Sequence, residues 1–140
     1  MKLPHWIRYT DKVKQGEARL FTISINPAKR GDIGLYTHEY EHIKQWYLCL
    51  VMGFLLALSV YLLIDNLTAS LFLAAVSISL KGILYSYVKP FRKWAEVKAF
   101  RAQIKVTEGE HVDFFANALA NDYKLNISYG KALQLLYGNN

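Results

Sequence analysis

Two long apolar runs dominate the middle of the chain. Residues 46–64 contain no charged side chain, and residues 67–88 contain only Lys81. Each run approaches the roughly 20 residues that a helix needs to cross a hydrocarbon core about 30 Å thick. Asp65 and Asn66 separate the two runs with a short polar turn. We therefore expect a hydrophobic helical hairpin over residues 46–88.

The residues before the hairpin predict one strand and the start of a helix. Residues 1–17 are mixed and polar, which is typical of a loop. Apolar and polar positions alternate in residues 20–25, so we expect a half-buried strand there. A polar connector over residues 28–34 leads to a helix that begins near Leu35 and continues into the first apolar run.

The residues after the hairpin predict three further helices. Residues 91–106 carry apolar side chains at three- and four-residue spacing, which indicates an amphipathic helix. Residues 107–110 break this pattern before a second helix over residues 111–121. Ser128 can cap a last short helix, which Gly138 stops.

A chain of 140 residues is long enough for one ordinary domain and too short for two. It contains no repeat at a fixed period and no low-complexity stretch. We therefore expect a single domain over residues 1–140, mainly α with a short β-strand or edge sheet (an α+β arrangement). In this domain the histidine-bearing helix continues into the hairpin of residues 46–88, which we expect to be transmembrane.

The net charge of +6 is consistent with a nucleic-acid partner or with an anionic membrane. The chain has no Arg-rich helix face and no recognisable nucleic-acid-binding module, so we expect no nucleic acid. Lys and Arg side chains instead flank the two apolar runs. The positive-inside rule then places both ends of a membrane-inserted chain in the cytoplasm. The alternative is a helical pair buried in a homo-oligomer or in a virus particle.

The pentapeptide His38-Glu39-Tyr40-Glu41-His42 is the strongest chemical signal in the sequence. On a helix, histidines at i and i+4 lie on one face about 5–6 Å apart at Cβ, where both can bind one Zn²⁺ ion. Glu39 leans toward the same ion without having to bind it, so it can act as general base toward a water that the metal activates. The pattern also arises by coincidence, but two of the four histidines fall in it and an apolar helix follows.

A catalytic zinc site needs a third protein ligand and an open position for water. The hairpin returns the chain to the level of the histidine pair near Glu96, if its arms are antiparallel helices. We therefore predict His38, His42 and Glu96 as the metal ligands. His111 is the competing third ligand, although a predicted break separates it from the returning helix. Glu41 is a poor candidate, because it points about 100° away from either histidine.

Two segments resemble a known family. The stretch Leu35-Tyr-Thr-His-Glu-Tyr-Glu-His-Ile-Lys-Gln45 resembles the active helix of the zincin metallopeptidases, and Glu96-Val-Lys-Ala99 resembles the Glu-x-x-Ala segment of their gluzincin branch. With the strand and the apolar hairpin, the pattern over residues 20–104 is similar to small uncharacterised peptidase-like proteins of bacteriophages and prophages. The resemblance implies three zinc ligands and one general base: His38, His42, Glu96 and Glu39.

The resemblance implies a zinc-dependent peptidase that hydrolyses an amide bond in a protein or a cell-wall peptide. It also implies that the strand at residues 20–25 is the edge against which an extended substrate lies. The alternative is a structural or interaction protein of a phage virion or membrane, with a zincin-like core that binds metal without activity. Glu39 distinguishes the two, because a purely structural zinc site does not require it. Five tyrosines are candidates for an oxyanion donor: Tyr36, Tyr40, Tyr85, Tyr87 and Tyr123.

Overall fold

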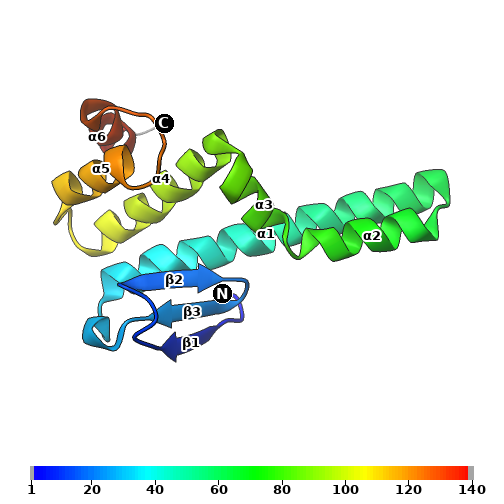
Figure 1. Cartoon of the computed structure of the whole chain (residues 1–140), viewed down its shortest axis with the longest axis horizontal. Coiled ribbons are helices and arrows are strands. Elements are labelled where there is room, and N and C mark those ends of the chain that lie inside the picture. Colours follow the sequence, from blue (N-terminus) through cyan, green and yellow to red (C-terminus); the bar gives the residue numbers. More distant parts are fainter. Residues whose placement is uncertain (1, 139–140) are drawn as a thin grey trace.

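Helix α1, Ile33–Ile64, runs from one end of the molecule to the other (Figure 1). The computed structural model describes residues 2–138. The Asp32 side chain caps the first turn of α1 by accepting a hydrogen bond from the Leu35 backbone N–H, and Asp65 ends the helix in the left-handed conformation. The predicted continuity between the histidine motif and the first apolar run is confirmed.

A three-stranded sheet covers one side of the first half of α1 (Figure 1). Strand β3, Thr22–Ile25, is its centre. It pairs in parallel with β1, Trp6–Tyr9, and antiparallel with β2, Gly16–Arg19. Alternate residues of β3 pack against α1 in a small buried cluster made of Ile23, Ile25, Leu35 and Ile43.

Strands β1 and β2 correct the prediction of a loop over residues 1–17. All four side chains of β1 are exposed, so no apolar alternation marks this strand in the sequence. β2 begins with a glycine and is only half-buried. The sheet order also corrects the expected edge, because the strand predicted at residues 20–25 is central and β2 is the end strand beside α1.

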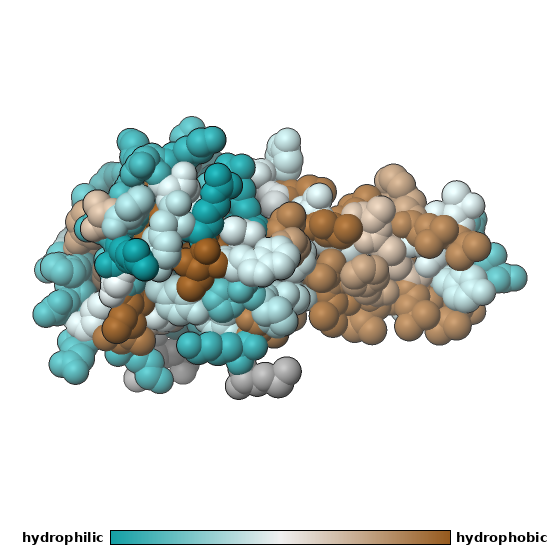
Figure 2. Space-filling model, turned by 90° about the horizontal axis from the view of Figure 1, so that it is seen from below, coloured by the Kyte–Doolittle hydropathy of each residue, from teal (hydrophilic) through white to brown (hydrophobic). Residues whose placement is uncertain are grey.

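We call residues 2–52 and 78–138 the head. Beyond the head, α1 and helix α2, Leu67–Ser77, form a projecting pair with an apolar surface (Figure 2). We call residues 53–77 the apolar arm. Its helices approach closely, since a Cβ at Gly53 would lie 2.1 Å from the Ser77 hydroxyl oxygen. Across the same interface the Ser70 hydroxyl donates to the Ala57 carbonyl. The arm therefore packs small and polar residues inside and exposes large apolar ones, the reverse of a water-soluble helix pair.

The second apolar run forms two helices and not one. Helix α3, Leu80–Tyr87, follows α2 at an angle of 65°. The chain between them makes tight i→i+3 hydrogen bonds, from Ile78 N–H to the Ala75 carbonyl and from Ser79 N–H to the Val76 carbonyl. The Trp46 indole then donates to the Ile78 carbonyl at 2.9 Å, which takes that carbonyl out of the helical pattern. The bend directs α3 back into the head, between α1 and α4.

The other side of α1 is covered by helix α4, Lys89–Val106, which α5, Val112–Asn121, and α6, Tyr129–Tyr137, extend into a second core. The three helices predicted after the hairpin are confirmed. Helix α4 begins two residues before the predicted start, because Pro90 fits a first helical turn, where no backbone N–H is needed.

The predicted class, mainly helical with a small sheet, is confirmed. By length and composition α1 can cross a membrane. Helices α2 and α3 meet the same criterion only as one bent segment.

Candidate metal centre

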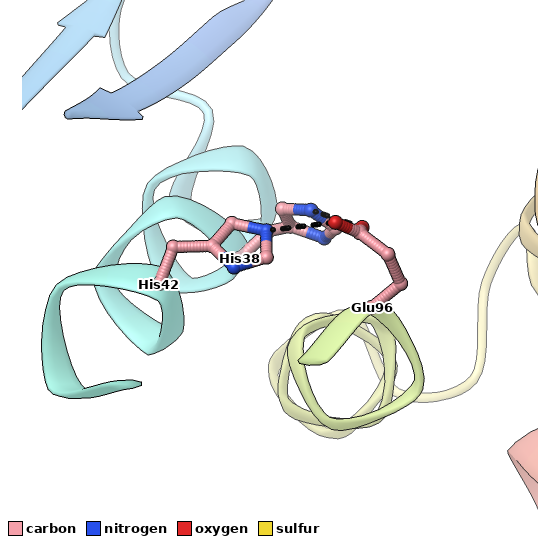
Figure 3. Close-up of side chains that lie close together, drawn as sticks. All are labelled: His38, His42 and Glu96. Atoms are coloured by element: carbon pink, nitrogen blue, oxygen red, sulfur yellow. Dashed lines mark ion pairs between the residues drawn. The ribbon is translucent and has the colours of Figure 1, made fainter. Parts of the chain in front are cut away.

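Two helices bring His38, His42 and Glu96 together (Figure 3). The histidines project from α1 with ring centres 5.0 Å apart, and Glu96 projects from α4. All three side chains are buried, and only 1% of Glu96 is exposed. Nε2 of His38 lies 3.5 Å from Oε2 of Glu96, and Nε2 of His42 lies 3.4 Å from Oε1. The three residues can therefore hold a metal ion.

The spacing of these atoms fits a bound cation better than it fits direct hydrogen bonds. Two ligand atoms that are each about 2.1 Å from a tetrahedral metal ion lie about 3.4 Å apart. A direct N–H···O bond would bring them to about 2.9 Å. Oε2 of Glu96 is buried and makes no hydrogen bond to any other described residue. A buried carboxylate oxygen requires such a partner, and a metal ion between the two imidazoles supplies one.

Gln45 fixes the orientation of His42. Its side-chain oxygen lies 2.9 Å from His42 Nδ1, and its amide nitrogen donates to the Ala95 carbonyl at 3.0 Å. An oxygen acceptor selects the tautomer in which Nδ1 carries the proton and Nε2 has a free lone pair. Because Ala95 precedes Glu96, the same amide also holds α4 in position against α1.

Glu96 is ionised despite its burial. Burial alone raises the pKa of a carboxyl group, but the adjacent His38 and His42 outweigh it and hold the pKa of Glu96 well below its usual range. The Tyr85 hydroxyl of α3 donates to Glu96 Oε1 at 2.6 Å. Burial and the Glu96 charge raise the pKa of Tyr123, which also lines the site, so its hydroxyl stays protonated and able to donate at neutral pH.

Glu39 lies against the first residue of β2. A Cβ at Gly16 would lie 3.0 Å from both Cγ and Oε1 of Glu39, so a larger residue there would require this carboxyl to shift by a few tenths of an ångström. Burial raises the pKa of Glu39 to about 7; His38 opposes this shift and the Glu96 charge adds to it. A carboxyl group with a pKa near neutrality can both accept and return a proton, as general acid–base catalysis requires.

A cleft of about 690 Å³ opens onto these residues. One wall is the end strand β2 with Leu20, and the other is helix α3 with the bend before it. Lys81, which interrupts the second apolar run in the sequence, lines this cleft together with the metal-binding residues. Apolar and aromatic side chains line both walls: Ala18 and Leu20 on one, and Trp46, Ile78, Ile83 and Tyr87 on the other.

The group that can hold a metal ion contains the three predicted ligands, and it contains neither His111 nor Glu41, the two alternatives that the sequence offered. Glu41 pairs with Lys44, and His111 is exposed at the start of α5, outside the site. Gln45 was not foreseen, although it lies one helical turn after His42. Tyr85 was foreseen only as one of five tyrosines, because the bend that turns it toward Glu96 has no clear sequence signal.

Comparison with protein-family models, curated proteins and solved structures finds no match for the chain.

Proposed function

We propose that the protein is a zinc-dependent metallopeptidase of the gluzincin type, with a minimal zincin-like fold. The observation that carries this proposal is the position of Glu39 in one cleft with His38, His42 and Glu96. Two imidazoles and one carboxylate are the ligand set of many catalytic zinc sites, which leave a fourth position open. A metal site that served only stability would not need a fourth ionisable side chain with a pKa of about 7 in the same cleft.

The side chains around the site divide the chemistry of amide hydrolysis among them. Zinc, when bound, polarises the substrate carbonyl and lowers the pKa of water to about 7. Glu39 accepts the proton of the attacking water and returns it to the leaving nitrogen. Tyr123, which lines the same cleft, can donate to a developing oxyanion, whereas the Tyr85 hydroxyl already donates to Glu96. The substrate is an extended peptide that pairs with the free edge of β2, a role the sequence resemblance gave to the neighbouring strand.

Two variants test the proposal with casein or a mixed fluorogenic peptide library. Glu39→Gln should keep one zinc per chain and lose hydrolysis by about 10²-fold or more, since the amide cannot accept the proton. His38→Ala should lose both zinc and hydrolysis. Metal content by atomic absorption and the rate of hydrolysis are the measurements. A Glu39→Gln protein as active as the parent would show that Glu39 is not the base.

The second candidate is a virion or membrane component whose metal centre is structural and inactive, which the exposed apolar arm favours. Chelation separates the two. A catalytic centre releases zinc while the far-ultraviolet circular dichroism stays unchanged, whereas a structural centre unfolds when zinc is removed.

We also propose that the protein is bound to a membrane. The apolar arm inserts into a membrane as a helical hairpin, so the head and both termini lie on the same side. The excess of Lys and Arg outside the two apolar runs makes that side the cytoplasm. Burial of the same surface in a homo-oligomer or a phage particle is the competing location.

A further inference from the structure

The apolar arm exposes large side chains in every direction around its axis. Phe54, Leu55 and Leu56 are consecutive and therefore point about 100° apart, yet each is about half exposed. Leu62, Leu71 and Phe72 add further exposed apolar surface. A protein partner would cover one face of such an arm, whereas lipid surrounds it, and close contact between small residues is typical of helix pairs in lipid. The occupant of this surface is therefore a lipid bilayer.

A chain of aromatic rings marks the level at which the arm leaves the head. Trp6 lies 4.9 Å from Phe21, Phe21 lies 5.9 Å from Trp46, and Trp46 lies 4.9 Å from Tyr47 between ring centres. We call these four residues the aromatic belt. Trp6 is 68% exposed despite its size. Trp46 is buried, with 7% exposed, and links the belt to α1. Tryptophan and tyrosine concentrate at the boundary between lipid and water, so the exposed Trp6 places the near headgroup layer at this level.

The length of α1 agrees with this level. From Trp46 to Ile64 the helix advances about 27 Å at 1.5 Å per residue, close to the hydrocarbon thickness of about 30 Å. The polar pair Asp65 and Asn66 then reaches the far headgroups. A shallower insertion would leave these two polar residues inside the hydrocarbon, which is costly. Helix α2 returns over only about 15 Å, so the bend and α3 complete the return to the level of the belt.

The metal cleft lies directly at the belt. Trp46 belongs to both, and its indole holds Ile78, which also lines the cleft. Leu20, on the opposite wall, is the chain neighbour of Phe21 in the belt. His42 precedes Trp46 by one helical turn, which is about 6 Å along the axis. The cleft thus opens within a few ångströms of the headgroup layer.

We propose that the substrate is a peptide segment attached to a membrane anchor and cut close to the point where it leaves the lipid. This inference rests on the proposed peptidase function. A distance of about 6–12 Å between the headgroup layer and the metal corresponds to two to four residues of extended chain at about 3.3 Å each. The anchor can be an acyl chain or a transmembrane helix, because both present the same extended backbone at the same height.

The test uses the full-length zinc-loaded protein in vesicles of phosphatidylcholine with phosphatidylglycerol. Three forms of one randomised fluorogenic peptide mixture are compared at equal total concentration: free, palmitoylated, and fused to a transmembrane helix. We expect at least tenfold faster cleavage of an anchored form, with scission sites mapped by mass spectrometry within about five residues of the anchor. Faster cleavage of only one anchored form identifies the source of the substrate. Equal rates for free and anchored peptides, or scission sites spread evenly along them, would overturn the inference and leave the peptidase intact.

A second measurement locates the cleft without using activity. In single-tryptophan variants, we expect Trp6 to be quenched by lipids brominated near the headgroup and a Leu55→Trp variant to be quenched by lipids brominated near the chain end. Phe114→Trp on α5 is the control and should not be quenched. Trp6 quenched no more than this control would overturn the placement. If Trp6 is quenched as expected but none of the three peptide forms is hydrolysed, the peptidase proposal is overturned, and the substrate inference with it.

Discussion

At the scale of single residues, the candidate metal site depends on side chains other than the three that could hold the ion. Gln45 is 2% exposed and joins His42 to the backbone next to Glu96, so one amide orients one ligand and positions the helix of another. The Tyr85 hydroxyl orients the Glu96 carboxylate by donating a hydrogen bond to Oε1. Such supporting hydrogen bonds set how well ligands are oriented before the ion binds.

Gln45→Met should weaken zinc affinity by about 10–100-fold, because the side chain keeps its size but loses both hydrogen bonds. Competition with a chromophoric zinc chelator measures this. Gln134→Met on α6 is the matched control and should bind zinc like the parent, since the exposed Gln134 side chain accepts a hydrogen bond from Lys131 and lies outside the metal site. Unchanged affinity in Gln45→Met would mean that the amide does not orient His42.

Glu39 should destabilise the metal-free protein at high pH. Its pKa is about 7 when folded and 4.5 ordinarily, so folding favours the protonated form. No cost arises below pH 4.5; the cost grows as pH rises to 7 and levels off above that at about 3 kcal/mol. Glu39→Gln in excess chelator should therefore melt higher than the parent at pH 8 but similarly at pH 4.5. Glu110→Gln, whose side chain is 75% exposed, is the control.

The three residues that could hold a metal ion were predictable from the sequence, but the residues that support them were not. Helix geometry alone places His38 and His42 on one face. The position of Glu96 could be predicted because two antiparallel arms of similar length return the chain to the level of the histidine pair. Gln45 and Tyr85 could not be assigned in this way. Their partners lie on other helices, and those contacts depend on how α1, α3 and α4 pack.

At the scale of elements, β2 and the bend before α3 shape the cleft. Both were missed, because β2 has no buried alternating face and the bend is stabilised by Trp46 from another helix. The long helix α1 was predicted well, since its caps and its apolar run are local features. Elements defined by local pattern were therefore foreseen, and elements defined by tertiary contact were not.

Gly16→Ala should reduce hydrolysis by about tenfold or more without changing zinc affinity. The added methyl would lie 3.0 Å from Glu39 Cγ and Oε1, so the carboxyl must move away from its position in the cleft. Gly130→Ala on α6 is the control, because nothing lies within 4 Å of a Cβ there. The rate of peptide hydrolysis and a zinc titration, measured on both variants, separate displacement of the base from loss of the metal.

At the scale of the whole molecule, the surface of the head is mainly hydrophilic and the surface of the arm is mainly hydrophobic (Figure 2). If the arm spans a bilayer, a reporter inserted at Asn66 should be active only on the outer side, and reporters at both termini only on the cytoplasmic side. The protein should also stay in the pellet after carbonate extraction. Release into the supernatant would instead favour burial of the arm in an assembly.

The order of the ligands along the chain has a consequence for biosynthesis. The histidine pair is made first, the hairpin second and Glu96 last. Until the hairpin has folded back, two ligands and the base stand on an isolated helix without the carboxylate that completes the set. For the proposed peptidase we therefore expect the nascent chain to show no hydrolysis, and activity to arise only when the hairpin has formed. Formation of the arm would then delay activity and spare cytosolic peptides during synthesis.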